Sequence, residues 1–109
     1  MDIQLLLALI WVHFVADFIL QSDWMAVNKS KRTAPLLAHV SVYSAPLLVF
    51  GWQFAMVNGA AHLIIDWISA RATSRLWAAG ERHWFFVVIG LDQAVHMSTL
   101  VLTYVALVG

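Results

Sequence analysis

Four long apolar runs follow one another along the chain, and they predict four membrane-spanning helices. The hydrocarbon core of a bilayer requires about 20 apolar residues in a helix, with a range of about 17–25. The runs cover about residues 3–20, 34–57, 59–79 and 84–107. They are too long for β-strands and show no alternation of period two. We therefore predict an all-α integral membrane protein: an antiparallel four-helix transmembrane bundle in a single transmembrane domain, residues 1–109.

The connections between the runs carry the expected turn signals. The only long polar stretch is Gln21 to Thr33, and Pro35 stands where the next helix would begin. Asn58-Gly59 is a tight-turn signal, so the second and third helices are predicted to form a hairpin that turns there. Gly80-Glu81-Arg82 separates the third helix from the fourth, and Pro46 predicts a kink in the second.

Composition agrees with a membrane protein and excludes several other classes. Hydrophobic residues make up 62% of the chain and charged residues 11%, whereas soluble domains average roughly 45–50% and about 25%. This composition excludes intrinsic disorder, and a net charge of zero disfavours nucleic-acid binding. The absence of cysteine excludes disulfides, thiolate metal sites and a cysteine nucleophile.

The basic residues predict the orientation in the membrane. All six lie in the first connection or around the third helix and its C-terminal connection: Lys29, Lys31, Arg32, Arg71, Arg75 and Arg82. With four spans, these connections share one side of the membrane. The positive-inside rule assigns that side to the cytoplasm and places both termini on the opposite side.

Each predicted helix carries one pair of polar residues spaced four apart, which places both members on one stripe of the helix. The pairs are His13/Asp17, His39/Tyr43, His62/Asp66 and Asp92/His96. The pairs fall at similar depths when measured from the basic end at about 1.5 Å per residue. An aspartate at the centre of a membrane helix costs roughly 2.5–3.5 kcal/mol, so such residues face the bundle interior and pair with one another.

Imidazole and carboxylate groups that converge in this way are ligands for a divalent metal ion, with zinc favoured. The candidate metal ligands are His13, Asp17, His39, His62, Asp66, Asp92 and His96. Asp17 and Asp66 are also the candidate catalytic residues. Three alternatives remain open: interhelical hydrogen bonds that only hold the bundle together, a relay for protons or ions, and a haem held by two histidines. Haem would leave the neighbouring aspartates unexplained.

Several stretches resemble the domain of unknown function 3307 family, which comprises small bacterial and prophage membrane proteins. The resemblance is carried by residues 13–24, by Asn28-Lys29, by Leu37-Ala-His39, by residues 82–86 and by Asp92-Gln93. It implies a bacterial inner-membrane protein, encoded by host or phage. In that membrane, the orientation predicted from the basic residues places both termini in the periplasm. The resemblance implies no established activity. Separately, His62-Leu-Ile-Ile-Asp66 is similar to a motif of inner-membrane metal-dependent hydrolases.

These observations favour a metal-dependent membrane hydrolase that acts on a lipid-like or phosphate-bearing substrate. In this hypothesis the metal ion activates water, and Asp17 serves as a ligand or as the base. The rival hypothesis is a non-enzymatic membrane protein whose polar cluster serves assembly, as a homo-oligomer or as a phage-encoded partner of a host protein.

Overall fold

The computed structural model of the chain describes residues 2–29 and 31–109, and these residues form helices joined by short connections. The elements are α1 (Ile3–Phe14), a π-helical turn η1 (Val15–Ile19), α2 (Asp23–Asn28), α3 (Thr33–Leu47), a 3₁₀ turn η2 (Leu48–Phe50), α4 (Trp52–Ala78) and α5 (Arg82–Leu107). The described residues contain no strand, which confirms the all-α prediction.

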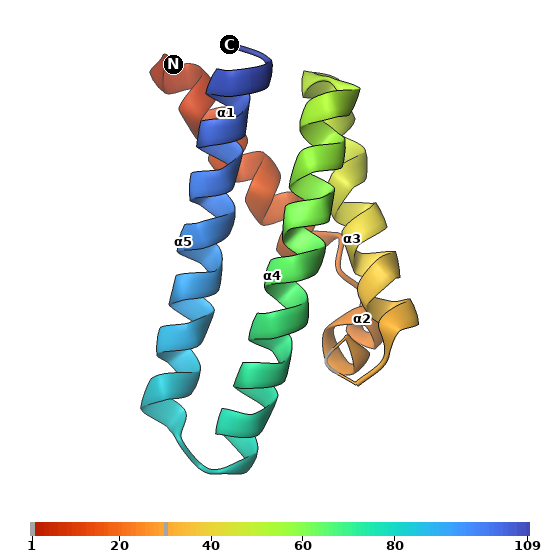
Figure 1. Cartoon of the computed structure of the whole chain (residues 1–109), viewed down its shortest axis with the longest axis vertical. Coiled ribbons are helices and arrows are strands. Elements are labelled where there is room, and N and C mark those ends of the chain that lie inside the picture. Colours follow the sequence, from red (N-terminus) through yellow and green to blue (C-terminus); the bar gives the residue numbers. More distant parts are fainter. Residues whose placement is uncertain (1, 30) are drawn as a thin grey trace.

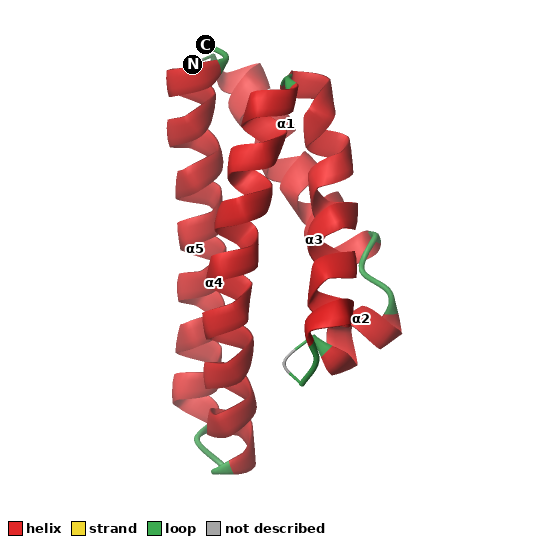
Figure 2. Ribbon diagram, turned by 45° about the vertical axis from the view of Figure 1, so that its right-hand side comes forward, coloured by secondary structure: helices red, strands yellow, loops and turns green. Residues whose placement is uncertain are grey.

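The long helices run antiparallel to one another, and both termini lie at the same end of the molecule (Figures 1 and 2). The 27-residue α4 and the 26-residue α5 form the longest hairpin. At about 1.5 Å per residue, this hairpin accounts for most of the 43 Å length of the molecule. Its turn extends beyond α2 and α3 at the end opposite the termini (Figure 1).

The first apolar run does not remain a regular helix. Asp2 caps α1 by accepting a hydrogen bond from the Leu5 backbone N–H. The last turn then widens into the π-helical η1, where the Leu20 N–H donates to the Val15 carbonyl at 2.9 Å. The next helix is the short α2, which is capped by the hydroxyl of Ser22. The polar connection predicted between the first two spans therefore contains a helix of its own.

The predicted hairpin turn at Asn58-Gly59 is wrong. α3 ends at Leu47 and passes into the 3₁₀ turn η2 directly after Pro46, which lacks the N–H for a helical bond to the residue four before it. The chain turns at Gly51, whose φ of 126° favours glycine.

Asn58 and Gly59 lie inside α4 and serve interhelical packing instead of a turn. The Asn58 amide donates to the Phe54 carbonyl at 2.9 Å and to the Thr103 hydroxyl of α5 at 2.8 Å. Residue 59 must be small, because a Cβ atom there would collide with the Ser44 hydroxyl of α3.

The other predicted turn is confirmed. α4 ends at Ala78 and α5 begins at Arg82, with Gly80 at a φ of 76° between them. Arg82 stabilises this turn by contacting the end of α4. Its guanidinium donates to the Trp77 carbonyl at 2.7 Å and lies 3.6 Å from the centre of the Trp77 ring.

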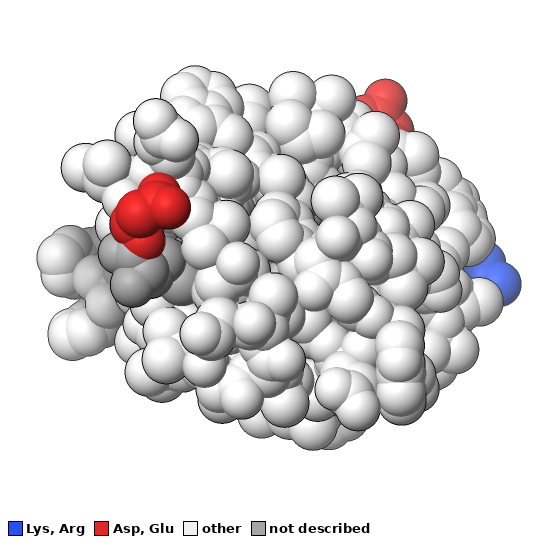
Figure 3. All heavy atoms as spheres, turned by 90° about the horizontal axis from the view of Figure 1, so that it is seen from above, with Lys and Arg blue, Asp and Glu red and all other residues white. Residues whose placement is uncertain are grey.

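Large apolar side chains cover the outside of the helices, whereas many of the buried residues are polar. Trp11 of α1 and Phe86 and Leu102 of α5 are 63%, 63% and 69% exposed. The end that carries the termini shows very few charged atoms (Figure 3). Two of the described helices, Thr33–Phe50 and Arg82–Leu107, are long and apolar enough to cross a membrane, and the apolar Ile3–Ile19 is shorter.

Candidate metal centre

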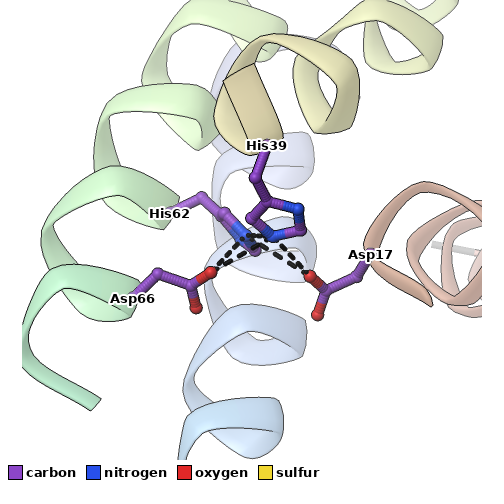
Figure 4. A group of neighbouring side chains, drawn as sticks. All are labelled: Asp17, His39, His62 and Asp66. Carbon is purple, nitrogen blue, oxygen red and sulfur yellow. Dashed lines mark hydrogen bonds and ion pairs between the residues drawn. The ribbon is translucent and has the colours of Figure 1, made fainter. Parts of the chain in front are cut away.

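Four buried polar side chains from three elements meet at one point inside the bundle (Figure 4). Asp17 comes from η1, His39 from α3, and His62 and Asp66 from successive turns of α4. Their exposed fractions are 5%, 0%, 0% and 2%. Each was expected on the inward stripe of its helix, and the structure brings their ligating atoms together.

The spacing of these atoms is that of ligands around one small cation. His39 Nε2 lies 2.9 Å from His62 Nε2, 3.0 Å from Asp17 Oδ1 and 3.2 Å from Asp66 Oδ2. His62 Nε2 lies 3.4 Å from Asp17 Oδ1 and 3.1 Å from Asp66 Oδ2. Nitrogen and oxygen ligands of tetrahedral zinc, at about 2.0–2.1 Å from the ion, lie about 3.3 Å from one another.

Hydrogen bonds alone do not satisfy all of these contacts. A neutral imidazole carries one proton, so each Nε2 is either a single donor or a lone pair. The Nε2 atoms of His39 and His62 face each other as well as both carboxylates. At least three of these five contacts would then lack a proton, whereas a cation at the centre would attract the atoms that surround it.

A second group of possible ligands adjoins the first through Asp66. His96 Nε2 of α5 lies 3.2 Å from Asp66 Oδ1 and 3.3 Å from Asp92 Oδ1. Asp66 thus presents one oxygen to each group. The side chain of Asp92 is further fixed by hydrogen bonds from the Ser69 hydroxyl at 2.6 Å and from the Gln93 amide at 3.1 Å.

The contact between the two histidines of these groups assigns them different roles. His62 Nδ1 lies 3.2 Å from His96 Nδ1, so a single proton serves both atoms. If His62 Nε2 binds a cation, its Nδ1 carries the proton and donates to His96. His96 then carries its own proton on Nε2 and donates to Asp66 and Asp92. If a cation bound to the Nε2 atom of each histidine, one of the two would have to be an imidazolate. With neutral imidazoles, the second group therefore holds no ion of its own and instead orients the ligands of the first group.

His13 lies outside the point where the ligating atoms converge. Its Nδ1 accepts a hydrogen bond from the Tyr43 hydroxyl at 3.0 Å, and its Nε2 donates to Gln93 Oε1 at 2.7 Å. The amide of Gln93 donates in turn to Asp17 Oδ2 at 3.3 Å. Both nitrogens of His13 are therefore engaged, and the chain of contacts orients Asp17.

Two residues of the centre were not assigned a role from the sequence. Gln93 is polar within an apolar run and forms part of the family resemblance, and neither signal gives it a role. Tyr43 was noted as the partner of His39, but its ring stacks on His62 with the centroids 3.9 Å apart. By contrast, Nδ1 of His39 is buried and has no hydrogen-bond partner among the described residues. His62 is therefore the better oriented of the two central histidines.

The carboxylates are balanced by Lys29, a residue to which the sequence assigned only a topological role. Its ammonium lies 3.5 Å from Asp66 Oδ2, and the other Lys and Arg side chains in the described ranges form no ion pair with these carboxylates. Asp17, Asp66 and Asp92 carry three negative charges when ionised. One divalent ion together with Lys29 neutralises them, provided that the histidines are neutral.

A cavity of about 700 Å³ opens beside this centre. Asp17, Asp66 and Asp92 form part of its wall, and its other residues come from η1, from α2 and the residues that flank it, and from α4 and α5. A molecule in this cavity would therefore reach the carboxylates directly.

The fold and the site define an all-α protein whose buried His/Asp groups could hold a metal ion. The chain belongs to the family described as Protein of unknown function (DUF3307), whose model matches residues 5–109. This confirms the resemblance found in the sequence. No curated protein and no solved structure matches the chain.

Proposed function

We propose that this protein is a metal-dependent membrane hydrolase, with one divalent ion, zinc favoured, bound at the candidate metal centre. The supporting observation is the set of 2.9–3.4 Å contacts among the ligating atoms of Asp17, His39, His62 and Asp66. The charge balance with Lys29 points to the same ion. The substrate, lipid-like or phosphate-bearing, enters from the adjoining cavity.

The roles follow from where the side chains lie. His39, His62 and Asp66 would be the three protein ligands of a divalent ion. Asp17 borders both the centre and the cavity, and Gln93 holds its Oδ2. The ion would supply Lewis acidity when bound. The Asp17 carboxylate would accept a proton from the attacking water and deliver it to the leaving group, so that water adds across the bond that breaks.

The membrane placement is part of the proposal. We place the helices as a four-helix transmembrane bundle in the bacterial inner membrane, with basic loops in the cytoplasm and both termini in the periplasm. The exposed apolar surfaces of α1 and α5 and the antiparallel order support this placement. Buried polar groups that face one another inside the bundle are typical of membrane proteins.

Elemental analysis of the protein purified in detergent without chelators tests the proposal. We expect one divalent ion per chain. Its removal by a chelator should abolish hydrolysis of activated esters or phosphoesters, and added zinc should restore the activity. The Asp17→Asn variant should retain most of the metal while its kcat falls about 100-fold or more, as expected for the loss of a general base. Folded protein without metal would contradict the proposal.

A second candidate function is assembly without catalysis. The interhelical contacts from His13 to Tyr43 and Gln93, and from Asn58 to Thr103, favour it because they need no metal. Under this hypothesis the protein acts as a homo-oligomer or as a partner of another membrane protein. Asp17→Asn would then be nearly silent, because an amide retains hydrogen-bonding capacity.

A further inference from the structure

We propose that the cavity beside the metal centre binds one amphiphilic molecule by its acyl chain and presents an uncharged ester to the centre. The catalytic part of this inference rests on the proposed hydrolase function, whereas binding in the cavity does not. The argument uses the polarity of the cavity wall, its size and the charge of the centre.

The wall of the cavity changes from polar to apolar along its length. On α4, Asp66, Ser69, Thr73 and Trp77 follow one another at intervals of three or four residues and lie on one face. On α5, Phe85, Ile89 and Asp92 are spaced in the same way. Because these two helices are antiparallel and joined beyond Trp77 and Phe85, the carboxylates stand together at one end and the aromatic rings at the other.

Several apolar residues of the cavity wall are only partly covered by the protein. Phe18, Val27 and Trp77 line the cavity and are 48%, 61% and 52% exposed. Such a wall suits an apolar chain that lies along it with one side open to lipid. The volume of about 700 Å³ falls within the roughly 300–1,000 Å³ of small-molecule sites, so one medium-length acyl chain with its head group fits.

Charge decides the class of head group. With one divalent ion bound, the ion and Lys29 together balance Asp17, Asp66 and Asp92, and no positive charge remains unmatched. A phosphate monoester would bring two further negative charges into a partly buried site that already contains three carboxylates. Burying an unmatched charge is costly, whereas an uncharged ester brings none.

Binding is tested with ethyl octanoate and octyl phosphate, titrated calorimetrically into the protein in zwitterionic lipid nanodiscs. We expect the ester to bind at least tenfold more tightly than the phosphate. Ala70→Phe fills the cavity, since Ala70 lines it and is 7% exposed, and should weaken ester binding at least tenfold. Thr73→Phe, at a less buried position of the same wall, replaces it if Ala70→Phe does not fold.

Ala60→Phe is the matched control, because Ala60 is exposed on the same helix and lines a separate groove against α3. It should bind the ester as the wild type does. Tighter binding of octyl phosphate would overturn the uncharged head group. Equal ester affinity of the Ala70→Phe, Thr73→Phe and Ala60→Phe proteins would overturn the cavity as the binding site.

Hydrolysis is measured separately with p-nitrophenyl octanoate, p-nitrophenyl acetate and p-nitrophenyl phosphate. The inference expects kcat/KM for octanoate to exceed that for acetate about tenfold, and this ratio to collapse in Ala70→Phe but not in Ala60→Phe. Ester that binds in the cavity without being cleaved would refute the hydrolase and leave the binding inference standing. Preferential cleavage of p-nitrophenyl phosphate would refute the inference and leave a hydrolase.

Discussion

Replacing Asp66 with asparagine should remove the metal ion while leaving the helices folded. Asp66 is a member of both groups of possible ligands, with Oδ2 3.1 Å from His62 Nε2 and Oδ1 3.2 Å from His96 Nε2. Asparagine nearly preserves the shape of the side chain but removes its charge. Because the change also makes α4 less polar, insertion into a membrane should become easier, not harder.

The size of the effect follows from the number of ligands. Apparent binding free energies of structural zinc are about 10–16 kcal/mol at neutral pH. Shared over the three protein ligands His39, His62 and Asp66, this gives roughly 3–5 kcal/mol for each ligand. Loss of one ligand should therefore weaken zinc binding about 200-fold to about 5,000-fold.

The assay compares zinc affinity and unfolding of the same samples, with Asp92→Asn as the matched control. Asp92 is also a carboxylate within 3.3 Å of His96 Nε2, but the proton shared by His62 and His96 places it outside the ligand set. Asp92→Asn should retain one ion per chain and weaken zinc binding far less than Asp66→Asn does, because Asp92 contacts His96, which is not a ligand in this assignment.

Two results would refute this reasoning. Full zinc occupancy and unchanged affinity in Asp66→Asn would remove Asp66 from the site. A wild-type stoichiometry of two ions that falls to one in Asp92→Asn would show that the second group is itself a metal site, and the single-ion assignment would be wrong.

Three further outcomes are expected. Zinc affinity should fall as the pH is lowered, because imidazole ligands bind a metal ion only in their neutral form, and an affinity independent of pH in competition titrations would exclude histidine ligands. Lys29→Met should tighten zinc binding about threefold to tenfold, since it removes a cation 3.5 Å from Asp66 Oδ2; weaker binding would mean that Lys29 positions the carboxylate. Asn58→Leu should lower the free energy of unfolding by about 1 kcal/mol by removing the bond to Thr103, and unchanged zinc affinity in that protein would separate packing from the metal centre.

The inward-facing residues were predictable because helical periodicity determines which side chains share a stripe. One ionisable pair on each apolar run left few ways to bury the charges except against one another, and His13, His39, His62 and His96 are all buried as expected. The turn at Gly80 was also predictable, because a glycine and two charged residues interrupt a long apolar sequence there.

The remaining features depend on contacts that no local pattern encodes. The Asn58-Gly59 sequence alone predicts a turn. In the structure Asn58 donates to Thr103 of α5, and Gly59 packs against Ser44 of α3. The role of Lys29 depends on α2, which returns the chain toward α4 after the break at Leu20. The difference between His62 and His96 depends on a single shared proton, which becomes apparent only once their Nδ1 atoms are known to face each other.

A π-helical turn begins between His13 and Asp17, which the sequence predicted as an equivalent pair and which take different roles. In a regular α-helix two residues four apart lie on one stripe. In η1 the hydrogen bonds run over five residues, as from Leu20 to Val15, so the residues after Phe14 do not follow the regular α-helical spacing. His13 Nε2 and Asp17 Oδ2 lie 3.8 Å apart. His13 turns to Tyr43 and Gln93, while Asp17 is left to face His39 and His62. Such turns are frequent at functional sites, and here one separates a residue of the metal centre from the residue that supports it.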